Sequence, residues 1–228
     1  MSQKQVPPPT SEAFEPPALS GAEGQSKSQL PLPEALNDEP RGRKWLRELG
    51  YRFRDHVFEY VEKGGTSYSS VAIGASEHAV IKTLIFQATP MAGASLPTDL
   101  APTDGHLVVL MHGDWNVDTK ALLVQLVDLK ESHELHEPVA TSNQVLRKVA
   151  AADPQRAEHW TGYRVGGTAP FALATPLSIY IESSILDLPR IWINAGARGH
   201  LLEMETSTLT KTLQLKPIRA GKPRAPRV

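Results

Sequence analysis

The sequence predicts an α+β fold in which a mixed β-sheet of six or more strands is surrounded by helices. Three observations lead to this prediction. Short apolar runs of strand length recur along the chain, segments with helical periodicity lie between them, and the two do not alternate at the regular spacing of parallel α/β sheets. A length of 228 residues, 40% of them hydrophobic, suits one globular domain with additional tail segments.

The elements of the first half follow in order from residue 43. A helix is expected at 43–49, because Gly50 takes the position after a helix end where glycine is favoured. Partial alternation of apolar residues indicates a strand at 51–61, and Gly64-Gly65 then turns the chain. The half continues with a helix at 67–75, a strand at 79–87 and a loop rich in proline and glycine at 88–105.

The second half begins with a strand at 106–112, whose run Leu107-Val108-Val109-Leu110-Met111 is typical of a strand buried on both faces. Leucines on one helical face predict a helix at 118–129. Asp153-Pro154, an N-cap residue followed by proline, starts another helix that ends near 160–162. Further strands are expected at 146–151, 178–182, 190–194 and 200–204, and a closing helix at 206–215.

The two ends of the chain are predicted to be disordered. Residues 1–42 hold eight of the 19 prolines and six acidic residues, with too few large apolar side chains to offset the entropy of ordering. Residues 216–228 carry five basic residues, three prolines and no acidic residue. This basic tail either contacts a phosphate backbone or only adds solubility, and both interpretations stay open. The folded domain is therefore expected to span 43–215.

Composition excludes several classes of function. The chain has no cysteine, which rules out disulfides, thiolate zinc sites, iron–sulfur clusters and a cysteine nucleophile. It contains 24 basic and 25 acidic residues, so bulk charge does not mark it as a nucleic-acid binder. No apolar run reaches membrane-spanning length, and the N-terminus lacks the pattern of a signal peptide. We therefore expect a cytoplasmic protein with no membrane partner.

Common catalytic signatures are absent. The sequence has no G-x-S-x-G elbow, no Walker A loop and no G-x-G-x-x-G after a strand. His133-Glu134-Leu135-His136 has one residue too few for the H-E-x-x-H spacing of a zinc site, and a solvated loop is the favoured interpretation. We expect neither a metal nor a cofactor.

Lys82 is a cation in an apolar strand, Val80-Ile81-Lys82-Thr83-Leu84-Ile85-Phe86. Because strands alternate faces, Lys82 shares a side with Val80 and Leu84. A charge among apolar neighbours needs a partner, water or a ligand anion. The alternative is a lysine that extends its charged end to solvent from an edge strand.

Two glycine-bearing segments are candidates for ligand binding. The first is Thr161-Gly162-Tyr163-Arg164-Val165-Gly166-Gly167-Thr168-Ala169-Pro170-Phe171, in which glycines let a ligand approach the main chain and successive amides can hold an anion. The second, Asn194-Ala195-Gly196-Ala197-Arg198-Gly199, joins two late strands and could line the same cavity. Either segment by itself is more often only a turn.

In combination, these segments resemble the YbaK/prolyl-tRNA synthetase-associated family of aminoacyl-tRNA editing domains. The lysine strand Val80-Ile81-Lys82-Thr83-Leu84 is similar to the family's V-x-K-T-L context, and Gly166-Gly167-Thr168-Ala169-Pro170 to its G-x-x-x-P loop. Residues 161–165 and 191–199 also resemble family motifs, and all motifs stand in the family's order across 43–215. The resemblance implies a partly barrel-like sheet.

The resemblance also implies a function. Members hydrolyse the ester that joins a wrong amino acid to tRNA, so the implied partner is the acceptor end of a mischarged tRNA, with prolyl-tRNA synthetase as a possible further partner. Threonine after the lysine resembles the branch that removes cysteine from tRNA(Pro). Such editing is needed because selection between amino acids of similar size yields only a few kcal/mol of discrimination.

The resemblance assigns roles to particular residues. No protein nucleophile is evident, so the attacking group is expected to be water or the substrate's own thiol, while the protein supplies position and charge. Lys82 is the expected catalytic residue, anchoring the tRNA terminus or stabilising negative charge. The expected substrate-binding residues are Gly166, Gly167, Thr168, Ala169 and Pro170, with Thr83, Tyr60, Asn194 and Gly196 as further candidates for lining the pocket.

Two other functions stay open at this stage. The chain could deacylate a tRNA mischarged with alanine, serine or threonine, or it could be a non-catalytic module that binds tRNA or a protein partner with the same fold. A module that only binds has no chemical reason to keep Lys82. A screen of deacylation across charged tRNAs separates the first alternative from removal of cysteine.

Overall fold

The computed structural model describes residues 39–131 and 145–225. Its helices are α1 (Arg41–Glu48), α2 (Gly65–Ile73), α3 (Thr119–Glu131), α4 (Pro154–Thr161) and α5 (Ser207–Thr212), with short 3-10 helices η2 (Glu77–Ala79), η3 (Ala101–Thr103) and η4 (Ser183–Asp187). Its strands are β1 (Arg54–Val57), β2 (Val80–Pro90), β3 (His106–His112), β4 (Trp115–Val117), β5 (Leu146–Ala151), β6 (Ser178–Glu182), β7 (Arg190–Ala197), β8 (His200–Glu205), β9 (Leu215–Ile218) and β10 (Gly221–Pro223).

Eight strands form one mixed sheet in the order β1-β8-β7-β2-β3-β6-β9, with β5 paired to β2 beside this path. The pairs β1–β8, β7–β8, β2–β3 and β2–β5 are antiparallel, whereas β2–β7, β3–β6 and β6–β9 are parallel. A second sheet of two strands joins β10 to β4. The predicted α+β fold with a mixed sheet of six or more strands is therefore confirmed.

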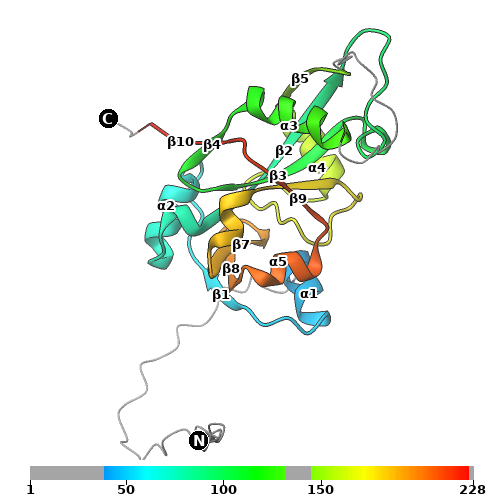
Figure 1. Ribbon diagram of the computed structural model, residues 1–228. Helices are drawn as coiled ribbons and strands as arrows, with labels where there is room; N and C mark the ends of the chain where they lie inside the picture. Colours follow the sequence, from blue (N-terminus) through cyan, green and yellow to red (C-terminus); the bar gives the residue numbers. More distant parts are fainter. Residues whose placement is uncertain (1–38, 132–144, 226–228) are drawn as a thin grey trace, which may run out of the picture. The chain divides into compact units, whose positions relative to one another are not determined.

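The sheet carries a core on each face, and β3 contributes to both. Val108 and Leu110 point into the first core, which also receives side chains from α1, α4 and α5. Leu107, Val109 and Met111 point into the second core, which α3 covers. Figure 1 shows α1 and α5 on the side of the sheet away from α3. Burial on both faces explains why β3 is apolar without alternation.

The ordered domain begins slightly before the predicted boundary. Helix α1 starts at Arg41, and its second residue, Gly42, is buried against the chain at Ala195 and Ala169. Arg41 lies over the ring of Tyr163, 5.0 Å from its centroid, and donates a hydrogen bond to the carbonyl of Gly162. The predicted disorder of 41–42 is wrong, because these residues pack on the glycine-rich segment.

The predicted disorder of the basic tail is wrong over residues 216–223. Strand β9 pairs with β6, and β10 pairs with β4. Pro217 is tolerated because β9 is the edge strand of its sheet. Basic residues of the segment form ion pairs within the fold: Lys216 with Asp99, Lys222 with Asp118 and Arg224 with Glu77.

Other boundaries differ by a few residues. The strand predicted at 51–61 is limited to β1, and the helix predicted at 206–215 is limited to α5, because the chain is extended from Leu213 and enters β9. Strand β2 continues to Pro90, three residues into the predicted loop, since it pairs there with β5. Among the described residues, none of the helices is long and apolar enough to cross a membrane.

Candidate functional site

Lys82 lies on β2 opposite Met111 of β3, on the same face as Leu84. The predicted alternation is confirmed, because Ile81 and Ile85 point into the core on the other face. The Lys82 side chain is half-buried, and its ammonium donates a hydrogen bond to the backbone carbonyl of Trp115. It is therefore fixed at its charged end rather than extended freely into solvent.

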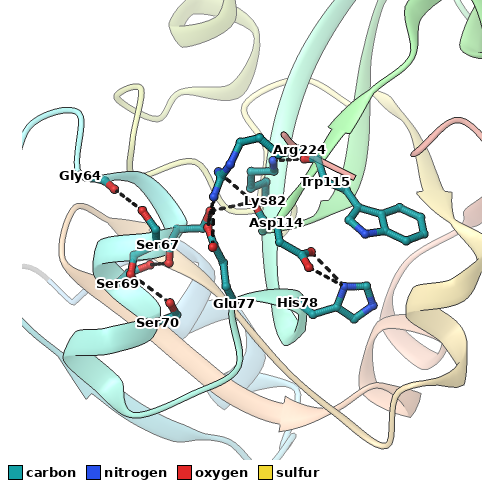
Figure 2. Close-up of polar contacts among 12 residues, drawn as sticks. Gly64, Ser67, Ser69, Ser70, Glu77, His78, Lys82, Asp114, Trp115 and Arg224 are labelled. Atoms are coloured by element: carbon teal, nitrogen blue, oxygen red, sulfur yellow. Dashed lines mark hydrogen bonds and ion pairs between the residues drawn. The ribbon is translucent and has the colours of Figure 1, made fainter. Parts of the chain in front are cut away.

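Three charged side chains surround this ammonium (Figure 2). They are Glu77 of η2, Asp114 in the turn between β3 and β4, and Arg224 after β10. Burial lowers the pKa of Lys82, and the positive charge of Arg224 lowers it further. The negative charges of Glu77 and Asp114 raise the pKa, but the net effect is a lowered pKa. The lysine therefore gives up its proton more readily than a solvated lysine does.

The geometry leaves the ammonium able to bind a ligand. An ammonium has three N–H donors. Within the described parts of the chain, Nζ of Lys82 has one hydrogen-bond acceptor, the carbonyl of Trp115. Two donors remain for water or for an oxygen atom of a ligand. Such a group can anchor a phosphate or a hydroxyl, or stabilise charge that develops on a carbonyl oxygen.

The second group of predicted residues forms a cluster around Asn194, within β7. The Asn194 side-chain oxygen accepts hydrogen bonds from the backbone N–H of Gly196 (2.8 Å) and Ala197 (3.2 Å), where the β7–β8 register shifts. Its amide nitrogen donates to the carbonyl of Gly166 at 3.3 Å. Asn194 therefore ties the two glycine-bearing segments together.

Tyr60 packs against the same segment. A Cβ on Gly166 would lie 2.9 Å from the Tyr60 hydroxyl, so the absent side chain of glycine permits this approach. Arg198 lies over the Tyr60 ring, 5.0 Å from its centroid, and donates to the carbonyl of Val165 at 2.9 Å. The cluster thus presents a partly exposed aromatic ring beside a guanidinium group.

The glycine-rich segment itself is held by its own polar groups. The Tyr163 hydroxyl donates to the carbonyl of Phe171 at 2.6 Å, and burial raises the pKa of Tyr163 to about 12. The N–H of Gly167 donates to the carbonyl of Arg164, so it is occupied within a turn. Ala169 and Pro170 are buried, and Thr168 is half-buried. Of the predicted binding loop, Gly166 is the residue most open to solvent.

Thr83 follows Lys82 and therefore lies on the other face of β2. It is opposite Leu110, which belongs to the core that also contains Ala169. Its hydroxyl oxygen is buried and has no hydrogen-bond partner among the described residues. The structure does not bring Thr83 beside the Lys82 ammonium.

Lys82 and the Asn194 cluster are linked through the β2–β7 pair. The parallel pairing ends with Ile81 opposite Ile193. Lys82 and Asn194 are the next residues on the two strands, and both side chains leave on the face opposite those isoleucines. The structure therefore places the lysine and the support of the glycine segment on neighbouring strands and on one face.

Several residues at the site were not found from the sequence. They are Glu77, Asp114, Trp115 and Arg224 around Lys82, and Arg198 beside Tyr60. Asp114 could have been found from the sequence, because it is a charged residue directly after a buried strand, in the turn His112-Gly113-Asp114. Arg224 had none, because its segment has the composition of a disordered tail.

No group of three or more metal-ligating side chains occurs in the part of the chain that the structure describes. The segment His133-Glu134-Leu135-His136 lies outside the described residues. Two surface hollows, of about 380 and 420 Å³, lie elsewhere in the fold. The first is lined by Asp104, Asp153, Gln155, Arg156, His159 and Trp160, and the second by Leu186, Leu188, Pro189, Glu205, Thr206, Ser207 and Thr210.

Part of the chain matches a known family model. Residues 124–212 match the family model of the aminoacyl-tRNA editing domain. The resemblance inferred from the sequence motifs is thereby confirmed. The matched segment of the editing domain contains the glycine-rich segment and the β7–β8 pair, while Lys82 lies before it.

Several solved structures share the fold of this chain. One is described as "a putative trans-editing enzyme for prolyl tRNA synthetase"; it is 20% identical with a TM-score of 0.54, and the match covers 79% of this chain and 96% of that one. The hypothetical protein APE2540 is 18% identical with a TM-score of 0.57, over 78% and 97%. A scaffold for computational epitope grafting is 16% identical with a TM-score of 0.59, over 80% and 95%. At these identities the likeness shows the fold.

Proposed function

We propose that this protein is a trans-editing hydrolase that removes a wrong amino acid from tRNA, with Cys-tRNA(Pro) as its principal substrate. The observation that carries the proposal is the half-buried Lys82 ammonium, two of whose donors have no partner among the described residues. It lies on the strand next to that of Asn194, in a chain with an editing-domain match. The acceptor end of the mischarged tRNA is the partner, and prolyl-tRNA synthetase is a further candidate partner. The proposal includes action in the cytoplasm.

The proposed chemistry uses the substrate's own thiol. The cysteine sulfur attacks the carbonyl carbon of its own ester, the bond from that carbon to the ribose oxygen breaks, and the thiol proton passes to the departing ribose oxygen. The tRNA leaves with a free hydroxyl, and water then opens the four-membered cyclic thioester to give free cysteine. Lys82 stabilises the negative charge that develops on the reacting oxygens, or holds the terminal nucleotide, from its fixed position beside the Trp115 carbonyl. Gly166 and the Tyr60 ring hold the aminoacyl group and the terminal nucleotide.

Esters without a thiol would need water as the attacking group, positioned by the terminal ribose hydroxyl. An enzyme for alanine, serine or threonine esters would use the same lysine with that attacking group. The proposal favours cysteine because Thr83 follows Lys82, as in the cysteine-editing branch that the sequence resembles.

The test is a panel of tRNA(Pro) species charged with cysteine, alanine, serine or proline, treated with wild type, Lys82→Ala and Lys44→Ala. Lys44 is an exposed lysine of α1 and serves as the matched control. We expect fast loss of the cysteinyl ester, about 10²-fold slower in Lys82→Ala and unchanged in Lys44→Ala, the scale expected when one charge-stabilising donor is removed. If the protein hydrolyses only the alanyl or seryl ester, it is still a deacylase, but cysteine is not its substrate. Binding without turnover would replace the proposal with a binding module.

A further inference from the structure

The turn that holds Lys82 is itself held by the C-terminal segment. Lys82 donates to the carbonyl of Trp115, and Trp115 lies opposite Pro223 in the β4–β10 pair. The backbone N–H of Arg224 donates to the carbonyl of Asp114 at 2.8 Å. The acceptor of the Lys82 ammonium, the carbonyl of Trp115, is therefore positioned by Pro223 and Arg224, which follow it by 108 and 109 residues.

The Arg224 side chain adds a second attachment. Its guanidinium donates to both carboxylate oxygens of Glu77, at 2.9 and 3.1 Å (Figure 2). The Thr66 hydroxyl of α2 has one proton, which it shares between the same carboxylate, at 2.8 Å, and the carbonyl of Gly113, at 2.9 Å. The arginine, the carboxylate and the threonine together fix the turn 113–115 from the side of α2 and η2.

The segment is also anchored before it reaches Arg224. The buried carboxylate of Glu182 accepts hydrogen bonds from the backbone N–H of Ala220 (2.8 Å) and Gly221 (2.7 Å). Gly221 packs against the Trp115 ring and against Met111, the residue opposite Lys82 on β3. A side chain at position 221 would not fit there. The close packing and the buried carboxylate make this segment part of the wall around Lys82.

We propose that residues 221–224 form a clasp over the Lys82 site and that Arg224 is its positioning residue. The functional part of this inference rests on the proposed deacylase. Arg224 acts through other groups, because the nitrogen that reaches Glu77 is occupied twice and its backbone N–H is bound by Asp114. Nη2 of Arg224 contacts both oxygens of Glu77, and Nη1 lies 3.5 Å from the carbonyl of Gly113, so the guanidinium links η2 to the turn.

If the clasp is correct, replacing Arg224 and replacing Glu77 should shift the pKa of Lys82 in opposite directions. The charged groups that act on the ammonium are Glu77 on η2, Asp114 in the turn, and Arg224. The ring of His78, also on η2, lies 2.9 Å from the Asp114 carboxylate. Arg224→Gln removes a positive charge and frees Glu77, so the pKa of Lys82 should rise. Glu77→Gln keeps an acceptor of the same shape for Arg224 and Thr66 but removes a negative charge, so the pKa of Lys82 should fall.

The measurement is a pH titration of the lysine side-chain NMR signals, with Lys82 assigned from a Lys82→Arg variant. Lys222→Gln is the matched control, because Lys222 lies on β10, two residues before Arg224, but its side chain pairs with Asp118 and it is not among the groups that shift the pKa of Lys82. We expect a raised pKa in Arg224→Gln, a lowered one in Glu77→Gln and no change in Lys222→Gln. Arg224→Lys keeps the charge and should stay nearer to wild type. Equal shifts in one direction for both partners, or no shift in folded Arg224→Gln, would overturn the clasp.

Activity provides a second readout. Loss of the clasp should displace the Lys82 ammonium while the substrate still binds. Arg224→Gln should therefore lower kcat roughly tenfold and leave KM nearly unchanged, and Arg224→Lys should recover part of the lost kcat. Full activity in Arg224→Gln would contradict the positioning role. If the wild type hydrolyses none of the esters, the proposed function fails, while the titration still decides whether the clasp controls Lys82.

Discussion

Lys82 shows how far one residue can be understood from its neighbours in sequence. A cation in an apolar strand indicated a special position, and the resemblance to editing domains gave it a role. The groups that set its charge could not be found in this way, because nothing in the sequence pairs Glu77 with Arg224, 147 residues away. Asn194 and Gly166 are likewise brought together across 28 residues by the fold.

Asp99 gives a prediction for the pH dependence of stability. Burial disfavours its charged form, but hydrogen bonds from Lys216 and Tyr180 outweigh this effect and lower the pKa of Asp99. A carboxylate with a lowered pKa stabilises the fold above its ordinary value near 3.9, and this contribution is lost as the pH falls through the folded pKa. Asp99→Asn should therefore lower the free energy of unfolding most at neutral pH.

Urea denaturation between pH 3 and pH 7 measures this effect. The difference between wild type and Asp99→Asn should shrink as the pH falls below about 4. Asp187→Asn, at an exposed residue of η4, is the control and should show little difference at any pH. A difference for Asp99→Asn that stays constant across the range would show that the carboxylate charge is not responsible.

At the scale of elements, helix α1 is positioned by a glycine. Glycine in a helix usually costs about 1 kcal/mol relative to alanine, so Gly42→Ala would be expected to stabilise a solvated helix. Here an added Cβ would lie 2.7 Å from the carbonyl oxygen of Ala195 and 3.0 Å from the Cβ of Ala169. We therefore expect the opposite sign, a loss of about 1–3 kcal/mol from overpacking.

Chemical denaturation of Gly42→Ala beside Lys44→Ala tests this sign. Lys44 is exposed on the same helix, and its replacement should change stability by less than about 0.5 kcal/mol. A more stable Gly42→Ala protein would mean that α1 does not pack on β7 as described. Because α1 also contacts the glycine-rich segment through Arg41, its displacement should loosen the candidate site.

The long apolar elements were predicted well from the sequence, and the short ones were not. Strand β6 was predicted at its observed bounds, and β3 and β5 likewise, because their apolar patterns are set by burial on the sheet. Strands β4 and β10 have three residues each, which is too short for an apolar pattern to be recognised. Strand β9 contains Pro217, which is acceptable only because the strand lies at an edge, a fact that depends on the whole sheet.

At the scale of the whole molecule, the basic C-terminal segment is part of the fold. Ile218 of β9 is 1% exposed and belongs to the core under α3. Ile218→Ala should therefore lower the free energy of unfolding by about 2–4 kcal/mol, whereas Arg219→Ala at the exposed neighbouring position should change it by less than about 0.5 kcal/mol. Thermal and urea denaturation measure both. If both variants changed the free energy of unfolding equally and by less than about 0.5 kcal/mol, the segment would not be part of the fold.

The central claim is that Lys82 carries an esterase activity toward mischarged tRNA. The most direct measurement is single-turnover hydrolysis of Cys-tRNA(Pro) with excess protein, comparing wild type with Lys82→Ala and subtracting spontaneous hydrolysis. We expect fast hydrolysis by the wild type and a loss of about 10²-fold in the variant, with the fold intact. Equal rates for the two proteins would contradict it.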